Sequence, residues 1–316
     1  MRKVLFINGQ SDDVARIVEK SMPIGFALDI CSSKLSEQEK IGRVGEAEFL
    51  IMHPAEISRT VLQSAKNLRH VQLLTAGYDK VDLQAANELG ISVATNGGTN
   101  AWAVAEQAIA LLLCLYRRLV QCDQSVRAGN WRQPISGMNT FELAGKTIGL
   151  LGVGNIGGKV AKRLKAFETN IIYHDRFKPN GDEFGGQSVS LETLLREADV
   201  LSIHVPLTAE TRGMIGAEQL ATMKPTAVII NTSRAEVFDE AALENALRTH
   251  QIAGAGLDVF HQEPPPKTCG LFALDNVVLS PHSAGHSYEA WFRRSHFAWE
   301  NIQRIVAGES PLSIAK

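Results

Sequence analysis

Short apolar runs alternate with mixed polar and apolar segments along almost the whole chain. Eleven of these runs are candidate strands, and most of them are apolar on both faces, as expected of parallel strands that helices cover on each side. The segments between them have helical spacing, so the pattern predicts repeated strand–helix–strand units and an α/β fold. The predicted strands are residues 3–8, 25–30, 48–52, 70–75, 91–95, 147–153, 170–175, 200–205, 227–232, 253–259 and 276–280.

Two further segments predict helices. Residues 101–127 contain neither Pro nor Gly, and their apolar residues are dense, so we expect one long helix buried between layers or domains. It should end at Ala128–Gly129. A last helix is predicted from near Ser287 to Val306, because Gly308 and Pro311 follow it. The long helix separates the strands into two sets, which predicts two domains.

Composition narrows the class of protein. A chain of 316 residues has room for two domains, and 45% hydrophobic with 21% charged residues is ordinary for a soluble protein. A net charge of −2 argues against nucleic acid as a partner. Four scattered cysteines without a CxxC pair indicate free thiols in a reducing compartment. Without a signal peptide or an apolar run long enough for a bilayer, a cytoplasmic protein with no membrane partner is expected.

A glycine-rich turn joins the strand at residues 147–153 to a helix. Gly152, Gly154 and Gly157 stand in GxGxxG register. The first allows a tight turn, the second lets the backbone approach a pyrophosphate, and the third allows close helix–strand packing. The N-terminus of the following helix supplies partial positive charge to the phosphates. Strand, glycines and helix together predict a dinucleotide site.

Asp175 ends the next strand, about 20 residues further along the chain. There its carboxylate would bind the adenosine ribose hydroxyls and repel a 2′-phosphate, which favours NAD over NADP. Arg176 and Lys178 follow at once and are able to accept a 2′-phosphate, so NADP stays a second choice. The alternative is that Asp175 only caps a turn.

Three polar side chains follow predicted strands in the second half of the chain: Arg234, Glu263 and His282. Ligands of doubly wound sheets gather beyond the carboxyl ends of the strands, so these three are candidates to share one cleft. A surface ion pair for Arg234 and a solvated loop charge for Glu263 remain alternatives at this point.

His282 and His286 are four residues apart, a spacing that suits two metal ligands on a helix. Pro281 and Gly285 make a continuous helix improbable there, and no cysteine or carboxylate cluster completes a site, so no metal is expected. We expect His282 to be the working histidine and His286 to lie at a hinge or helix start.

The chain resembles the D-isomer-specific 2-hydroxyacid dehydrogenase family. The resemblance rests on LLTAGYDKVDL, NGGTNAWAVAEQAIALLL, GKTIGLLGVGNIG, HVPLTAETRGMIG, INTSRAEVFDE, LDVFHQEP and LSPHSAG, in the order of the family's blocks. It implies two doubly wound parallel-sheet domains. One is a Rossmann NAD-binding domain at residues 100–285; the other is a flavodoxin-like substrate (catalytic) domain at residues 1–99 plus 286–316.

The resemblance also implies catalytic roles. Arg234 matches the family's catalytic arginine, Glu263 its glutamate and His282 its histidine. An arginine fork suits the carboxylate and carbonyl oxygens of a 2-oxo acid. His282 would give its proton to the carbonyl oxygen in reduction and take the hydroxyl proton in oxidation. Glu263 would orient the ring and raise its pKa, so that the pair titrates as one unit.

Binding roles carry over in the same way. Ala76 and Gly77 match the backbone segment that grips the substrate carboxylate, together with Arg234 and His282. Asp258 matches the residue that contacts the nicotinamide carboxamide. For the apolar members of the cofactor set, core packing is an equally good interpretation. The remaining cofactor positions are Val104, Asn155, Ile156, Arg176, Val205, Pro206, Thr211, Thr232 and Ser233.

Some residues depart from relatives within the family. The family often has Arg-Gly after the strand at Arg234, whereas Ala235 and Glu236 follow Arg234 here. His53 stands where phosphoglycerate dehydrogenases usually carry arginine, which weakens a phosphorylated substrate. The formate dehydrogenase branch has glutamine at the position of Glu263, so Glu263 favours hydroxyacid chemistry.

The expected function is therefore NAD(H)-dependent interconversion of 2-oxo acids and D-2-hydroxy acids by a homodimer. Glyoxylate, hydroxypyruvate and arylpyruvates are the first substrates to test. One alternative is an NAD-sensing protein like the corepressors of this fold, which bind partner peptides. Another is phosphite or formate oxidation. The sequence does not give the physiological substrate, the direction of flux or the pathway.

Overall fold

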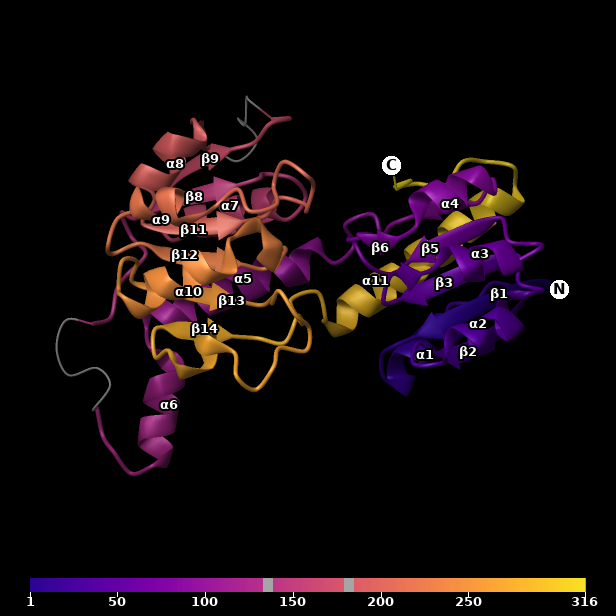
Figure 1. Cartoon of the computed structure of the whole chain (residues 1–316), viewed down its shortest axis with the longest axis horizontal. Helices are drawn as coiled ribbons and strands as arrows, with labels where there is room; N and C mark the ends of the chain where they lie inside the picture. The colour runs from indigo at the N-terminus through magenta and orange to yellow at the C-terminus, as the bar shows by residue number, and fades with distance from the viewer. Residues whose placement is uncertain (133–138, 179–184, 316) are drawn as a thin grey trace. The chain divides into compact units, whose positions relative to one another are not determined.

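The chain folds into two compact units in the computed structural model, which describes residues 1–132, 139–178 and 185–315. Unit 1 comprises Met1–Asn100 and His286–Lys316, and unit 2 comprises Ala101–Gly285. Each unit has its own sheet with helices around it (Figure 1). The chain therefore enters unit 2 after Asn100 and leaves it after Gly285.

Unit 1 contains a five-stranded sheet with all strands parallel, in the order β2-β1-β3-β5-β7. Counted among these five strands alone, this is the 2-1-3-4-5 order of flavodoxin-like folds. Its elements are β1 (Arg2–Asn8), α1 (Asp12–Lys20), β2 (Phe26–Ser32), α2 (Glu37–Val44), β3 (Phe49–His53), β4 (Glu56–Ile57), α3 (Arg59–Ser64), β5 (His70–Leu73), β6 (Lys80–Val81), α4 (Leu83–Glu88), β7 (Ser92–Ala94) and α11 (Tyr288–Val306).

Unit 2 contains a seven-stranded parallel sheet in the order β10-β9-β8-β11-β12-β13-β14. This is the 3-2-1-4-5-6 order of Rossmann folds with one more strand, so the predicted fold class is confirmed. Its elements are α5 (Ala101–Tyr116), α6 (Leu119–Arg127), β8 (Thr147–Leu151), α7 (Gly157–Lys165), β9 (Asn170–His174), β10 (Gln187–Ser188), α8 (Leu191–Glu197), β11 (Val200–Ile203), α9 (Ala217–Ala221), β12 (Val228–Asn231), the 3-10 turn η3 (Ala235–Val237), α10 (Glu240–Arg248), β13 (Gly254–Leu257), η4 (Gly270–Ala273) and β14 (Val277–Leu279).

All eleven predicted strands are present, and the last helix begins after its N-cap residue Ser287, as predicted. The central strands β11, β12 and β13 are buried along their whole length, which explains their continuous apolar character. The prediction missed β4, β6 and β10. Each of these has only two residues and is too short to carry a hydrophobic period.

The single long helix predicted at residues 101–127 is wrong. The segment forms two helices, α5 and α6, and Arg118 between them has the left-handed backbone angle φ +49°. Eight residues of α5 are buried, whereas α6 buries none of its residues. Figure 1 shows α6 extending away from the sheet of its unit. Packing on the sheet therefore ends with α5, and the chain turns there without a Gly or Pro to signal it.

Glycine in β13 lets α5 lie close to the sheet. A Cβ atom on Gly256 would come within 2.9 Å of both the Leu111 Cβ atom on α5 and the Ile230 side chain on β12. A larger residue would push the helix away from the strand. The close approach fixes α5 against the strands whose carboxyl ends carry the candidate site.

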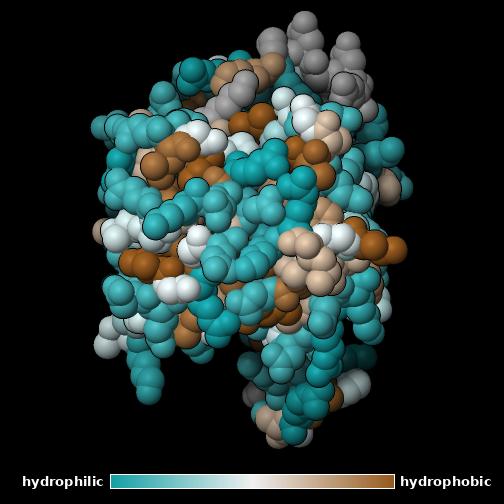
Figure 2. Space-filling view, turned by 90° about the vertical axis from the view of Figure 1, so that its right-hand side faces the viewer, coloured by the Kyte–Doolittle hydropathy of each residue, from teal (hydrophilic) through white to brown (hydrophobic). Residues whose placement is uncertain are grey.

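The face in Figure 2 is mostly hydrophilic, with hydrophobic residues in small separate groups. Among the described residues, every helix is too short or too polar to cross a bilayer. The four cysteines are free thiols, of which Cys31 is buried.

One histidine of unit 1 is buried and contacts two polar side chains. His70 is fully buried; its Nδ1 atom is 2.9 Å from the Ser92 hydroxyl and its Nε2 atom 3.3 Å from Oε1 of Gln72. Burial lowers the pKa of His70 to about 4, against the smaller upward effect of these two hydrogen bonds. The ring is therefore neutral in the folded protein at pH 5, where the unfolded chain holds a proton.

We predict that His70 makes unit 1 sensitive to acid. Its folded pKa lies below its unfolded value of 6.5, so stability falls as pH drops from about 6.5 towards 4. Between pH 7 and pH 5 the group should cost about 2 kcal/mol of unfolding free energy. Urea unfolding at both pH values measures this difference. From pH 7 to pH 5 the unfolding free energy of His70→Gln should fall by about that much less than the unfolding free energy of wild type.

The exposed His261 provides the matched control. His261→Gln should keep the wild-type difference in unfolding free energy between pH 7 and pH 5. Because each variant is compared with itself at two pH values, any constant loss of stability from the substitution cancels. An equal pH dependence in His70→Gln and wild type would contradict the prediction.

Candidate active site

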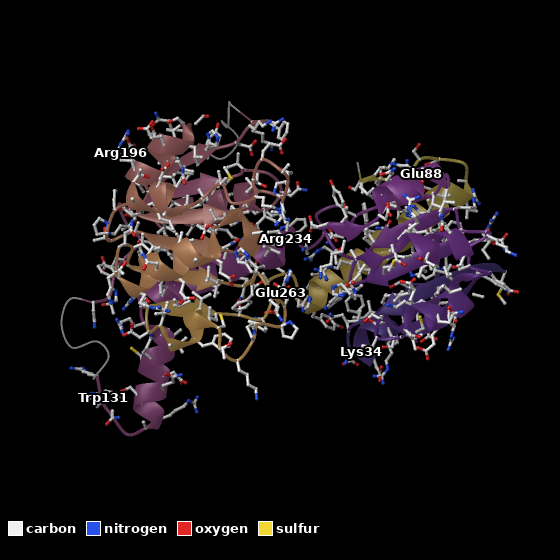
Figure 3. All side chains as sticks on the ribbon, in the orientation of Figure 1. Lys34, Glu88, Trp131, Arg196, Arg234 and Glu263 are labelled. Atoms are coloured by element: carbon white, nitrogen blue, oxygen red, sulfur yellow. The ribbon has the colours of Figure 1, made fainter. Side chains whose placement is uncertain are left out.

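The candidate residues of unit 2 gather at one edge of its sheet. All seven strands are parallel, so the turns that follow β8, β9, β11, β12, β13 and β14 lie at the same edge. Figure 3 shows Arg234 and Glu263 at this edge, whereas Trp131 lies away from them, beyond α6. Residues from distant parts of the sequence are thereby brought together.

The glycine-rich turn is tightly packed and open on one side. Gly152 has φ +90°, and a Cβ atom on Gly157 would lie 2.1 Å from the Gly152 carbonyl oxygen. A Cβ atom on Gly154 would meet no atom within 4 Å. The turn leads directly into α7, where the N–H groups of Gly158 and Lys159 bond to the carbonyl oxygens of Gly154 and Ile156. This arrangement suits a pyrophosphate that approaches at Gly154.

Asp175 holds the end of β9 against the glycine-rich turn. Its Oδ2 atom accepts a hydrogen bond of 2.8 Å from the Val153 N–H, and its Oδ1 atom accepts from the N–H groups of Phe177 and Lys178 at 2.8 and 3.1 Å. The carboxylate is thus fixed beside the turn. Arg176 is exposed next to it, with its guanidinium 5.3 Å from the Phe177 ring centre.

Two buried polar atoms near this edge lack a hydrogen-bond partner among the residues that the structure describes. They are the Thr232 hydroxyl, just after β12, and Nδ1 of His204, just after β11. The His204 ring lies beneath the glycine-rich turn, where a Cβ on Gly157 would be 3.3 Å from its Cδ2 atom. Buried polar atoms normally find a partner, so these atoms and the open side of Gly154 fit a bound dinucleotide.

His282 and Glu263 form a hydrogen-bonded pair. The Nδ1 atom of His282 lies 2.7 Å from Oε2 of Glu263, and Oε1 of Glu263 accepts a hydrogen bond of 3.1 Å from the Phe260 N–H. The His282 side chain is 47% exposed and that of Glu263 is 36% exposed. Because Nδ1 is engaged by the carboxylate, Nε2 is the ring nitrogen left to exchange a proton with a ligand.

The surroundings of Glu263 keep it ionised. Burial alone would raise the pKa of Glu263, but the hydrogen bond and charge of His282, the Phe260 N–H and the charge of Arg234 together lower it below its ordinary value. The carboxylate is therefore available near neutral pH to hold the His282 ring.

Arg234 is placed by a turn that the sequence reasoning missed. Asn231 is buried at the end of β12, where its Nδ2 atom donates to the Arg234 carbonyl oxygen at 2.8 Å. Its Oδ1 atom accepts from the N–H and hydroxyl of Ser233 at 3.0 and 3.1 Å. An asparagine directly after a strand, followed by Thr-Ser, is the signal for such a turn. The Arg234 guanidinium also donates to the Ser233 carbonyl at 2.8 Å.

Asp258 is fully buried and bonded to the loop that carries His282. Its carboxylate accepts hydrogen bonds from the Ser280 hydroxyl and from the N–H groups of Ser283 and Ala284. The predicted contact of Asp258 with the nicotinamide carboxamide stays a prediction.

The other predicted positions fall into four groups. Thr211 closes the turn after β11, because its hydroxyl donates to the Pro206 carbonyl at 2.7 Å. Val104 is buried in the first turns of α5. Ala76 and Gly77 follow β5 in unit 1, so they lie in a different unit from the catalytic candidates. At the edge described above lie Asn155, Ile156, Val205 and Ser233.

His282 and His286 belong to different units, since the chain leaves unit 2 between Gly285 and His286. Both precede α11, so the expectation that they do not share a helix is confirmed. His286 packs against other rings of unit 1, with its ring centre 5.8 Å from that of His53 and 5.3 Å from that of Trp291. Within the described ranges, no group of three or more His, Cys, Asp or Glu side chains is placed to hold a metal ion.

A cavity of about 450 Å³ adjoins the His282–Glu263 pair. Its walls are mostly apolar, with the two paired side chains and a hydroxyl as polar groups. The lining residues are Phe260, Glu263, Pro264, Pro265, Phe272, Leu279, Ser280, Pro281 and His282.

Comparisons with known proteins agree with this arrangement. Residues 109–284 match the family model described as "D-isomer specific 2-hydroxyacid dehydrogenase, NAD binding domain". A glyoxylate reductase of Korarchaeum cryptofilum is 41% identical over 294 residues, which are 90% of this chain and 88% of that one. A D-3-phosphoglycerate dehydrogenase of Archaeoglobus fulgidus is 36% identical over 97% of this chain, which spans 58% of that protein.

A similar solved structure is the NADPH-dependent glyoxylate/hydroxypyruvate reductase of Sinorhizobium meliloti in complex with NADP and malonate. It is 28% identical, with a TM-score of 0.85 over 99% of this chain and 96% of that one.

Proposed function

Since this chain belongs to the D-isomer-specific 2-hydroxyacid dehydrogenase family, we propose that it reduces small 2-oxo acids to D-2-hydroxy acids. The family consists of oxidoreductases, and the relatives named glyoxylate reductase and hydroxypyruvate reductase make these two acids the first candidates. The observation that carries the proposal is the 2.7 Å pair of His282 and Glu263 at the edge that also bears Arg234 and the glycine-rich turn.

Three side chains have separate roles in the proposed reaction. Arg234 binds the carboxylate and the carbonyl oxygen of the 2-oxo acid, and so polarises the carbonyl group. Glu263 holds Nδ1 of His282, which directs Nε2 towards the ligand. The imidazolium of His282 then gives its Nε2 proton to the carbonyl oxygen, and the product is the hydroxyl of the 2-hydroxy acid. In the reverse direction neutral His282 takes that proton.

The cofactor we propose is NAD(H), with NADP(H) as second choice. Bound at the glycine-rich turn, it would supply the hydride that adds to the carbonyl carbon. The turn and the N-terminus of α7 would hold the pyrophosphate, and Asp175 would face the adenosine ribose. Thr232 has a buried hydroxyl free for this ligand within the part of the chain that the structure describes. The exposed Arg176 supports the second choice, as does the NADP bound to the S. meliloti relative.

The test of the reaction is turnover of 2-oxo acids by the purified protein. Loss of NADH absorbance should follow addition of glyoxylate, hydroxypyruvate or an arylpyruvate. His282→Ala should lower kcat by about a thousandfold, because the proton donor is lost, while the Kd of NADH changes less than about twofold. His286→Ala is the matched control, since this ring packs within unit 1, and its kcat should fall far less.

Two outcomes would contradict the proposal. Tight NADH binding without turnover of any acid in the panel would favour a nucleotide-sensing protein. Equal kcat values for wild type and His282→Ala would exclude His282 as the proton donor.

The preference for NADH rests on the charge of Asp175. We expect Asp175→Asn to raise the kcat/KM ratio of NADPH to NADH by about tenfold, because the repulsion of a 2′-phosphate is removed, which is about 1.4 kcal/mol. The amide oxygen still accepts one set of backbone N–H bonds, so the turn should persist. Steady-state kinetics with both cofactors measures the ratio. Asp199→Asn, at an ion pair with Lys224 away from the turn, should leave it unchanged.

We propose that the protein is a homodimer in which a second copy covers α6. This helix buries no residue in the single chain, and Leu119, Val120 and Val126 are 57%, 41% and 54% exposed. Trp131, which follows the helix, is 75% exposed. An apolar surface of this kind is typical of a protein interface.

A charge on this surface should separate the two copies. Sedimentation velocity should give a dimer for wild type and a monomer for the double variant Val120→Glu/Val126→Glu, because buried charges of the same sign oppose association. Exposed Leu89 of unit 1 provides a control: Leu89→Lys should leave the dimer intact. A wild-type monomer at micromolar concentration would refute the proposal.

A further inference from the structure

The loop that carries His282 is built around one buried carboxylate. Oδ1 of Asp258 accepts hydrogen bonds from the Ser280 hydroxyl at 2.5 Å and the Ser283 N–H at 3.0 Å, and Oδ2 accepts from the Ala284 N–H at 2.9 Å. The Asp258 carbonyl oxygen accepts the His282 N–H at 2.7 Å. Every one of these donors lies within residues 280–284, so Asp258 fixes this loop on both sides of His282.

A second side chain extends this arrangement into α5. The amide nitrogen of Gln107 donates to the Ser280 hydroxyl oxygen at 3.3 Å, and that hydroxyl donates to Asp258. Ser280 is the one side-chain donor among the three groups that the structure places on the Asp258 carboxylate. The chain of contacts therefore runs from a helix packed on the sheet, through a hydroxyl, to a carboxylate without solvent exposure.

The backbone of His282 has a conformation that is unfavourable for a residue other than glycine. Its φ angle is +51°, in the left-handed region, which costs a non-glycine residue roughly 1 kcal/mol or more. Such a residue persists only where its surroundings over-determine it. The hydrogen bonds to Asp258 from both sides of His282 are that constraint.

We propose that Gln107, Ser280 and Asp258 form a positioning chain that holds His282 where its ring meets Glu263. The inference rests on the function proposed above, in which His282 transfers the proton. None of the three residues donates or accepts that proton through these contacts. They set the direction of the ring, and a ring displaced by about 1 Å loses up to a hundredfold in rate.

The hydrogen bonds of Asp258 join segments from the two ends of unit 2. Ala284 is the last but one residue of unit 2, and Gln107 lies in the second turn of the helix that opens the unit. The positioning chain therefore holds both ends of unit 2 to the strand end that bears Asp258. The geometry of the proposed proton donor is thereby tied to the segments through which the chain enters and leaves the unit.

The experiment removes the hydroxyl and then restores it. Ser280→Ala should lower kcat by about 10- to 100-fold, with KM for the 2-oxo acid and Kd for NADH within about twofold of wild type. Ser280→Thr keeps a hydroxyl and should recover kcat to within about threefold. Gln107→Leu should give a smaller loss than Ser280→Ala, because the hydroxyl still reaches Asp258. Ser190→Ala, which removes the N-cap hydroxyl of α8, is the control for an ordinary structural serine.

A crystal structure of Ser280→Ala gives a readout that does not depend on activity. The expected result is a distance above 3.5 Å between Nδ1 of His282 and Oε2 of Glu263, or a φ angle of His282 outside the left-handed region. Unchanged loop geometry, or a kcat equal to that of wild type, would overturn the positioning chain. If wild type reduces no 2-oxo acid, the proposed function fails, and the crystal structure still decides whether Ser280 holds His282.

Discussion

The parallel direction of the seven strands in unit 2 is the constraint on which the candidate site depends. A parallel sheet places the carboxyl ends of all its strands at one edge, and each return connection crosses to the other edge. The turns at the carboxyl edge are thus free to differ in sequence without disturbing the buried strands. A glycine-rich turn, an arginine, a glutamate and a histidine from well-separated parts of the chain meet there for that reason, although no two of them are close in sequence.

Backbone N–H groups fix the carboxylates at this edge. Asp175 and Asp258 each accept a hydrogen bond from a main-chain N–H in a neighbouring turn, and Glu263 accepts one from the Phe260 N–H in its own loop. A main-chain donor cannot swing away as a lysine side chain can, so it sets the direction of a carboxylate more firmly than a surface ion pair. Through the same hydrogen bonds, each carboxylate also stabilises the turn that supplies the N–H group. The loops at this edge are therefore ordered by the same side chains that give it its negative charge.

The sequence predicted the fold well because buried strands and glycine turns leave local signals. Eleven apolar runs marked the strands, and the glycine-rich turn marked the start of α7. The break between α5 and α6 left no such signal, since the residue with the left-handed angle there is Arg118 and not a glycine. Arg234, Glu263 and His282 were found as strand-end residues. Asn231 and Ser280 were missed, because their importance lies in hydrogen bonds to other turns, which no period or spacing along the chain encodes.

Exposure separates two carboxylates that serve the same histidine. Glu263 is 36% exposed and pairs with a ring that is 47% exposed, whereas Asp258 has no exposed surface. A group that exchanges protons with a ligand has to be reachable, and exposure of this degree weakens its hydrogen bonds through competition with water. A group that only holds a loop gains from burial, because hydrogen bonds are stronger where water is excluded. The exposed part of the site is thus the imidazole ring and Glu263, and the buried part is the Asp258 carboxylate, which binds the backbone next to His282. His282 thus has an accessible ring on a main chain that is held by hydrogen bonds to Asp258.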